Sequence, residues 1–295
     1  RIHDAEPERA ARALRELDTR GLDDAALGTA SFLLAHVLGE KFGAWAEAAE
    51  RIDAALAHSA EPPVRALRNA AVAHRLAGHA TKADQAQARL AQTGQTTPAA
   101  AALVVDLHAL AFTPPGAATA SWAHTLRALG ERANRLASAG GLETSLAAGL
   151  NNATSALLDA AGQPPSADEA AALRAGAQAA RTAWLRAGGW VQHERAQYLL
   201  ALVLNRCGDA AGALEAAQSG LRLIAANGEE EVDRAFLLLQ SASAHAQREA
   251  RAEALADLAS AQAIAQSWSD EGLRAWFADE LGKAPGLAAL LGSAA

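Results

Sequence analysis

The sequence predicts an all-α fold of about fourteen helices, arranged as antiparallel hairpins. Composition is the first reason, because 51% of the residues are hydrophobic but only 4% are aromatic, and Ala and Leu dominate the apolar set. Ala and Leu are strong helix formers, and the β-branched residues that favour strands are scarce. The second reason is that apolar residues recur with the three- and four-residue spacing of a helix face. The third is that Gly and Pro fall largely between these runs, where they stop helices.

Residues 194–225 show the hairpin pattern most clearly. Two apolar-periodic runs are separated by Cys207, Gly208 and Asp209. Gly208 can end the first helix in the left-handed conformation, and Asp209 can cap the second helix by accepting bonds from its free N–H groups. Small residues are expected where the two helices approach each other closely, at Ala201, Ala213 and Gly220.

This stretch resembles a tetratricopeptide repeat, a helix-turn-helix unit of about 34 residues. The family pattern has a small residue in the first helix, Gly at the turn, Ala five residues later and a small residue seven beyond that. Ala201, Gly208, Ala213 and Gly220 match it, whereas the Trp, the Tyr or Phe and the Pro of the family are replaced here by Gln197, Ala217 and Ala225. The resemblance implies a right-handed superhelical solenoid of the bacterial long-helix type.

The same spacing recurs along the chain. Gly43 and Gly78 are 35 residues apart, close to the family period, and each is followed by Ala five residues later. Farther on, Ala213 lies 41 residues after Ala172 and 41 before Ala254, which indicates longer helices in the C-terminal half. The chain is therefore expected to be an array of such hairpins.

The other helices and loops are also predicted from local sequence signals. Pro62 and Pro63 open one helix, and Ser166 and Glu169 have the spacing of a capping box for another. Helices are also expected over residues 4–20, 25–39, 99–112 and 142–161, from 166 to 188, from the 113–119 loop to residue 139, and around Trp276 and Phe277. Residues 113–119 are expected to form a loop that joins the N-terminal repeats (1–112) to the C-terminal repeats (120–295), and the two parts are expected to form one continuous superhelix. The segment after Pro285 is expected to cap its apolar end.

Charge and cysteine content limit the function. The net charge of −7 and the lack of a basic block argue against nucleic-acid binding. No apolar run is long enough to span a membrane. A single cysteine rules out an intrachain disulfide and suits a reducing compartment, so we expect a cytoplasmic protein. The sequence begins at Arg1 and contains no Met, so we expect that its native N-terminus is missing.

No catalytic, metal or phosphate-binding motif is present, so the sequence predicts a protein that is not an enzyme and needs no cofactor. His74 and His79 are five residues apart, which is expected to place them on different helix faces, and a metal site there is disfavoured. Cys207 is expected to be a structural thiol. Trp45, Trp184 and Trp276 are expected in the core, whereas Trp190 is either a turn-packing residue or an exposed anchor.

The resemblance implies that first helices of the repeats line a groove for a peptide or partner helix. Asn amides can hold a peptide backbone, and Arg can bind a carboxylate with two parallel hydrogen bonds. The partner implied is a protein or peptide with acidic or C-terminal carboxylate groups. The matching groove positions are Arg68, Asn69, Arg75, Asn152, Tyr198, Asn205, Arg206, Gln240 and Gln247.

Two other functions remain open. The chain could be the sensory or dimerising part of a larger bacterial signalling protein, whose output domain lies outside this sequence. It could also be a helical enzyme whose pocket is built from distant side chains. Such a pocket should show ionisable groups with strongly shifted pKa values in a deep cleft.

Overall fold

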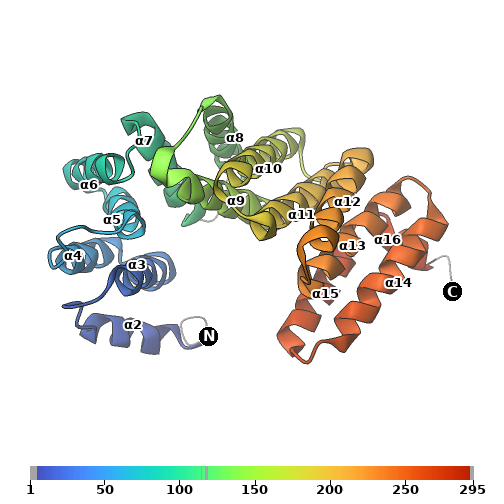
Figure 1. The fold of residues 1–295 in the computed structure, drawn as a ribbon, viewed down its shortest axis with the longest axis horizontal. Coiled ribbons are helices and arrows are strands. Elements are labelled where there is room, and N and C mark those ends of the chain that lie inside the picture. Colours follow the sequence, from blue (N-terminus) through green and yellow to red (C-terminus); the bar gives the residue numbers. More distant parts are fainter. Residues whose placement is uncertain (1–4, 114, 117–118, 293–295) are drawn as a thin grey trace. The chain divides into compact units, whose positions relative to one another are not determined.

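The computed structural model describes residues 5–113, 115–116 and 119–292, and this part of the chain is helical with no strand. It contains fifteen α-helices, one π-helix and one short 3-10 helix (Figure 1). Each helix packs mainly on its neighbours in sequence, and α5, for example, contacts both α6 and α7. The predicted all-α array of helical hairpins is therefore confirmed. The hand of the superhelix stays a prediction.

The helices divide into two compact units. Unit 1 comprises residues 1–115 and 131–153, and unit 2 comprises residues 116–130 and 154–295. The first boundary falls inside the predicted joint 113–119, of which Pro114, Ala117 and Ala118 lie outside the described residues. The division differs from the expected one because residues 131–153 return to unit 1.

Unit 1 contains the N-terminal helices, and two helices contribute to both units. The helices wholly in unit 1 are α2 (Pro7–Glu16), α3 (Asp24–Leu33), the π-helix η1 (Leu34–Lys41), α4 (Trp45–Leu56), α5 (Val64–Leu76), α6 (Ala80–Thr93), α7 (Pro98–Ala111) and the 3-10 helix η2 (Gly140–Leu142). The shared helices are α8 (Thr119–Arg135) and α9 (Glu143–Ala160).

Unit 2 continues the pattern with longer helices, as the 41-residue spacing predicts. They are α10 (Ala167–Ala187), α11 (Trp190–Arg206), α12 (Ala210–Asn227), α13 (Glu231–Gln247), α14 (Arg251–Ser267), α15 (Glu271–Lys283) and α16 (Leu287–Gly292). Helix α11 packs on α12 and also on α13, so first helices of consecutive hairpins touch.

Three of the helical hairpin turns, α5–α6, α11–α12 and α13–α14, share one geometry. Gly78 and Gly208 have φ of 75° and 74°, and the residue after each donates its N–H to the carbonyl five residues earlier. This is the Schellman arrangement that glycine favours. The α13–α14 turn forms the same bonds with Glu249 at φ 59°, and Asp209 caps α12 by accepting from Gly212 N–H at 3.0 Å. The predicted turn chemistry at 207–209 is confirmed.

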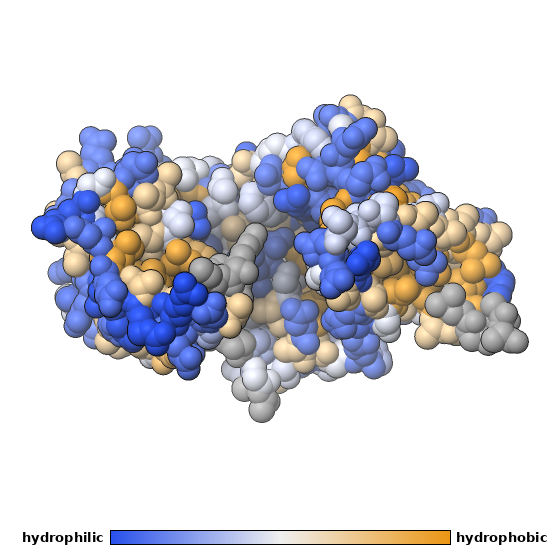
Figure 2. Space-filling view, turned by 90° about the horizontal axis from the view of Figure 1, so that it is seen from below, coloured by the Kyte–Doolittle hydropathy of each residue, from blue (hydrophilic) through white to orange (hydrophobic). Residues whose placement is uncertain are grey.

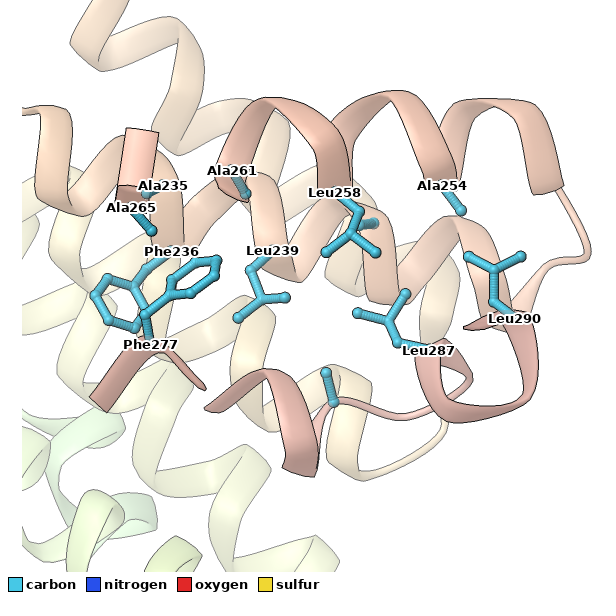
Figure 3. Packing of buried hydrophobic residues seen from close by; sticks show 12 residues of the cluster. Ala235, Phe236, Leu239, Ala254, Leu258, Ala261, Ala265, Phe277, Leu287 and Leu290 are labelled. Atoms are coloured by element: carbon cyan, nitrogen blue, oxygen red, sulfur yellow. The ribbon is translucent and has the colours of Figure 1, made fainter. Parts of the chain in front are cut away.

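The small residues of the repeat pattern lie where helices meet. Ala213 and Ala254 are completely buried, and a side chain at Gly220 would place its Cβ only 2.7 Å from Leu237 on α13. Figure 3 shows the core of α13 to α16, in which Phe236 and Phe277 pack against leucines and alanines of the neighbouring helices. The repeat spacing thus marks the positions of closest helix approach.

Several predicted details are wrong. The helix expected over 25–39 is an α-helix only to Leu33, after which the backbone continues as a π-helix to Lys41. Among the described residues, the helix expected over 4–20 is α2 (Pro7–Glu16), which has Pro7 in its first turn and ends before the extended Leu17; Asp4 lies outside the described residues. The helix expected to reach residue 139 ends at Arg135.

Trp276 is also misplaced by the prediction, since it is 48% exposed and covers the edge of the core, with its ring 4.3 Å from that of Phe236. Trp45, Trp184 and Trp190 are each half-buried. On the face shown in Figure 2, hydrophilic and apolar side chains are intermixed, and orange apolar atoms occur over both the N-terminal and the C-terminal helices.

Candidate functional site: an Arg68 groove in unit 1

A cavity of about 640 Å³ lies in unit 1 between α3, η1, α5, α7 and α9. We call it the Arg68 groove. Its volume is within the range of sites that bind small molecules or peptide side chains. Its lining comprises Phe32, His36, Glu40, Val64, Arg65, Arg68, His108, Ala111, Phe112, Gly141, Thr144, Ser145, Ala148 and Asn152.

Arg68 is the most unusual residue of the groove, because it is a cation that is only 8% exposed. Its Nε and Nη2 groups donate to Oδ1 of Asn69 at 3.2 and 2.8 Å. Asn69 is held in turn, since its Nδ2 group donates to Oγ of Ser31 at 2.9 Å. The guanidinium is therefore fixed by neutral groups.

The remaining nitrogen of Arg68, Nη1, lies 3.4 Å from Nε2 of His108. That nitrogen is also 2.8 Å from the carbonyl oxygen of Ser145. Burial, and then the charge of Arg68, lower the pKa of His108 to about 3, so its imidazole is neutral. Because Nε2 of His108 donates its proton to the Ser145 carbonyl, it cannot also accept from Arg68. Nη1 is thus left without an acceptor in the described part of the chain.

No carboxylate of a described residue pairs with Arg68. Burial, and then repulsion by Arg65, lower the pKa of Arg68 to about 10, so the side chain is still charged at neutral pH. A buried charge without a counter-ion is costly, and such charges in proteins are normally paired. Arg68 is therefore preorganised to receive an anion.

Aromatic side chains form the wall beside this charge. The ring of His36 stacks on Phe32 at 5.5 Å, and Phe112 lies 6.5 Å from Phe32. The guanidinium of Arg65 lies over Phe32, 5.4 Å from the ring centre. These contacts orient Arg65 and give the groove an apolar surface next to its cations.

The π-helix contributes a contacting His–Glu pair to the same groove. His36 Nδ1 lies 2.5 Å from Oε2 of Glu40, and both residues belong to η1. Single π turns within helices are frequent at functional sites. Gly149 of α9 has no side chain, and a Cβ there would lie 3.1 Å from Leu107 and 3.2 Å from the His108 ring. Glycine thus allows α9 to close the groove around His108.

Of the nine predicted groove residues, only Arg68 and the exposed Asn152 line the Arg68 groove. Asn69 is completely buried behind Arg68, so it positions that side chain and cannot itself reach a ligand at the surface. Arg75 is exposed outside the groove, where it pairs with Asp106 and donates to Gln87.

The other five predicted residues belong to unit 2. Tyr198 packs against Phe236, and burial raises the pKa of its phenol. Asn205, which is 1% exposed, donates to the buried Gln240 and accepts from Gln247. Arg206 lies beside this network, and Asn205, Arg206 and Gln247 line a separate cavity. Their role in binding a peptide stays a prediction.

Sequence reasoning missed Arg65, His36 and His108. Arg65 precedes Arg68 by three residues, the spacing of one helix face, and His108 interrupts an otherwise apolar run. Arg65 and His108 could therefore have been identified from the sequence. The position of His36 could not be predicted, because it depends on the π-helix.

His74 and His79 also differ from expectation, since their Nδ1 atoms lie 3.3 Å apart. His74 reaches across the helix end, and its Nε2 lies 3.0 Å from the carboxylate of Asp53. Within the described residues, however, no group of three or more His, Cys, Asp or Glu side chains is arranged to hold a metal ion.

Comparisons with known proteins do not assign the chain to a protein family. No protein-family model matches it, and no curated protein is similar to it in sequence. Among the described helices, none has the length and apolar character needed to cross a membrane.

Proposed function

We propose that the protein is a binding module, and that the Arg68 groove takes an acidic segment or C-terminal carboxylate of a protein or peptide. The observation that carries this proposal is the buried guanidinium of Arg68, which has neutral partners and a free donor group at a cavity. A carboxylate there would accept hydrogen bonds from a cation already held in place, so little ordering entropy is lost on binding.

The helical array supports the same function. Hairpins that stack side by side create extended surfaces suited to an elongated partner. The resemblance to tetratricopeptide repeats also favours a binding function. It implies that the chain acts as a scaffold or adaptor. The aromatic wall formed by Phe32 and Phe112 would contact an apolar side chain next to the bound carboxylate.

A catalytic role for the groove has less support, although Arg68 and His108 do show the shifted pKa values expected of an enzyme pocket. A general base works best with a pKa near the operating pH. The pKa of His108 is about 3 and that of Arg68 about 10, so neither group exchanges protons readily at neutral pH. Both are instead suited to fixed hydrogen bonding.

Binding can be tested with pools of random fluorescent hexapeptides that differ only at the C-terminus. One pool carries a free carboxylate, a second carries an amide, and a third is amidated but enriched in Asp and Glu. Fluorescence anisotropy should show binding of the first or third pool and weaker binding of the second. Equal binding of all three pools would contradict the proposal.

Variants of Arg68 sharpen the test. Arg68→Gln should weaken peptide binding by roughly ten- to a hundredfold, the usual contribution of a hydrogen bond to a charged group. Arg68→Lys keeps the charge but loses the planar guanidinium, so its peptide affinity should lie between that of the native protein and that of Arg68→Gln. Arg12→Gln, which removes an exposed charge on α2, is the matched control and should bind as the native protein does.

A further inference from the structure

We propose that unit 2 contains a second, independent binding site, which takes a small organic anion. The site is a cavity of about 430 Å³, which we call the Arg206 cavity. Four segments meet there: the loop between α9 and α10, the end of α11, the end of α13 and the link between α15 and α16. The volume suits a small ligand and is too small for a folded partner.

The charge of the lining points to an anion. Arg206 and Lys283 line the cavity, and no Asp or Glu does. Lys283 is already neutralised, because its Nζ lies 2.5 Å from Asp279 and 3.5 Å from Glu280. The side chain of Arg206 has no hydrogen-bonding or ion-pairing partner in the described part of the chain, and its Nε is buried without an acceptor. One uncompensated positive charge therefore remains at the cavity.

The rest of the lining defines the body of the ligand. Pro164, Pro165 and Pro285 contribute rigid apolar surface. The amides of Asn205 and Gln247 are joined by a 2.9 Å hydrogen bond, so this wall is fixed before a ligand arrives. Apolar walls with one well-placed charged group are typical of sites for small amphiphilic molecules. The ligand is thus a compact apolar molecule with one carboxylate or phosphate group.

The site binds its ligand without covalent chemistry. Cys207 also lines the cavity, but burial raises the pKa of its thiol. The nucleophilic form of cysteine is the thiolate, so this thiol is a weaker nucleophile than an exposed cysteine and is alkylated slowly. Arg206 therefore serves to hold the anion.

Cys207 provides a direct test, because it is the only cysteine of the chain. The rate at which iodoacetamide alkylates it can be followed by mass spectrometry in the presence of benzoate, phenyl phosphate or the neutral benzamide. Benzoate or phenyl phosphate should slow the reaction saturably, and the difference between them identifies the preferred anion. Benzamide should have little effect. Equal protection by benzamide, or no protection by either anion at millimolar concentration, would overturn the proposal.

Variants separate this site from the Arg68 groove. Arg206→Gln should weaken protection by roughly ten- to a hundredfold. Arg222→Gln, an exposed charge on α12, and Arg68→Gln should leave it unchanged. Circular dichroism and the alkylation rate without probe report whether Arg206→Gln is folded, and Arg206→Lys provides a milder variant. Undiminished protection in both Arg206 variants would refute the assignment, without affecting the function proposed for unit 1.

Discussion

Replacing Arg68 by Gln should make unit 1 more stable, although it removes a buried side chain with two hydrogen bonds. The native guanidinium is 8% exposed and has no counter-ion among the described residues. Gln retains a polar group that can donate to Asn69, but it has no charge to desolvate. The expected gain in stability is the opposite of what a structural arginine would show.

The magnitude follows from the pKa. Burial, and then repulsion by Arg65, lower the pKa of Arg68 from 12.5 to about 10, and this difference corresponds to about 3 kcal/mol. Both the folded and unfolded states are protonated below pH 10, so the folded state carries this full cost at neutral pH, and the cost declines only as the pH rises toward 12.5. Losing one of the two hydrogen bonds to Asn69 costs about 1 kcal/mol. The net gain should be about 2 kcal/mol.

Urea unfolding at pH 7, followed by circular dichroism, measures this difference. The midpoint should rise with an unchanged m-value, and a thermal midpoint should rise by about 2 to 4 °C per kcal/mol. Arg12→Gln is again the control and should change stability by less than about 0.5 kcal/mol. Sulfate, offered as a simple anion, should stabilise the native protein more than Arg68→Gln.

A loss of stability in Arg68→Gln would refute the reasoning. A decrease of more than about 1 kcal/mol with an unchanged m-value would show that the charge is well satisfied inside the fold. The Arg68 groove would then have no special affinity for anions, and the proposed function would lose its main support.

Further predictions concern unit 2. Burial, and then Asp233, raise the pKa of Glu194 well above its ordinary value of 4.5, so its contribution to stability is fully present below about pH 4.5 and is lost progressively as the pH rises toward the folded-state pKa. Glu194→Gln should flatten this slope in thermal melts between pH 5 and 9; an unchanged slope would point to another group. Glu249→Gly should stabilise by about 0.5 to 1 kcal/mol by relieving a positive φ, whereas Gly208→Glu should destabilise by about 1 to 2 kcal/mol. Chemical unfolding measures the free energy of unfolding of both variants. Changes of the same sign in the two variants would contradict the prediction.

Much of the fold could be predicted because it depends on local signals. Gly208 and Asp209 specify a turn by their own backbone and side-chain chemistry, and Ala213 and Gly220 mark close contacts by their size. The π-helix could not be predicted, because hydrogen bonds between residues i and i+5 leave no distinct pattern in the sequence. Trp276 was misjudged because helical spacing identifies an apolar face but not whether another element covers it.

The candidate site was harder to predict than the fold. The resemblance placed Asn69 and Gln240 on a groove surface, but they are buried in the interior and form hydrogen bonds within the protein. Polar residues at regular spacing look alike whether they face a ligand or a neighbouring helix. What distinguishes Arg68 is the absence of a nearby carboxylate in three dimensions, and that information is not local in sequence.

The π-helix of unit 1 also has a consequence for how the chain tolerates insertions and deletions. Successive residues of an α-helix are separated by about 100° around its axis, so a deletion of one residue rotates everything before it relative to everything after it by that angle. The wider turns of a π-helix offset this rotation, so a one-residue deletion within Leu34–Lys41 that restored ordinary α-helical winding would keep Phe32 and Trp45 in register and would displace only the side chains inside the segment, such as His36 and Glu40. Length variation of a single residue at this point would thus change the His36–Glu40 side of the Arg68 groove, while the helical hairpins before and after it kept their packing.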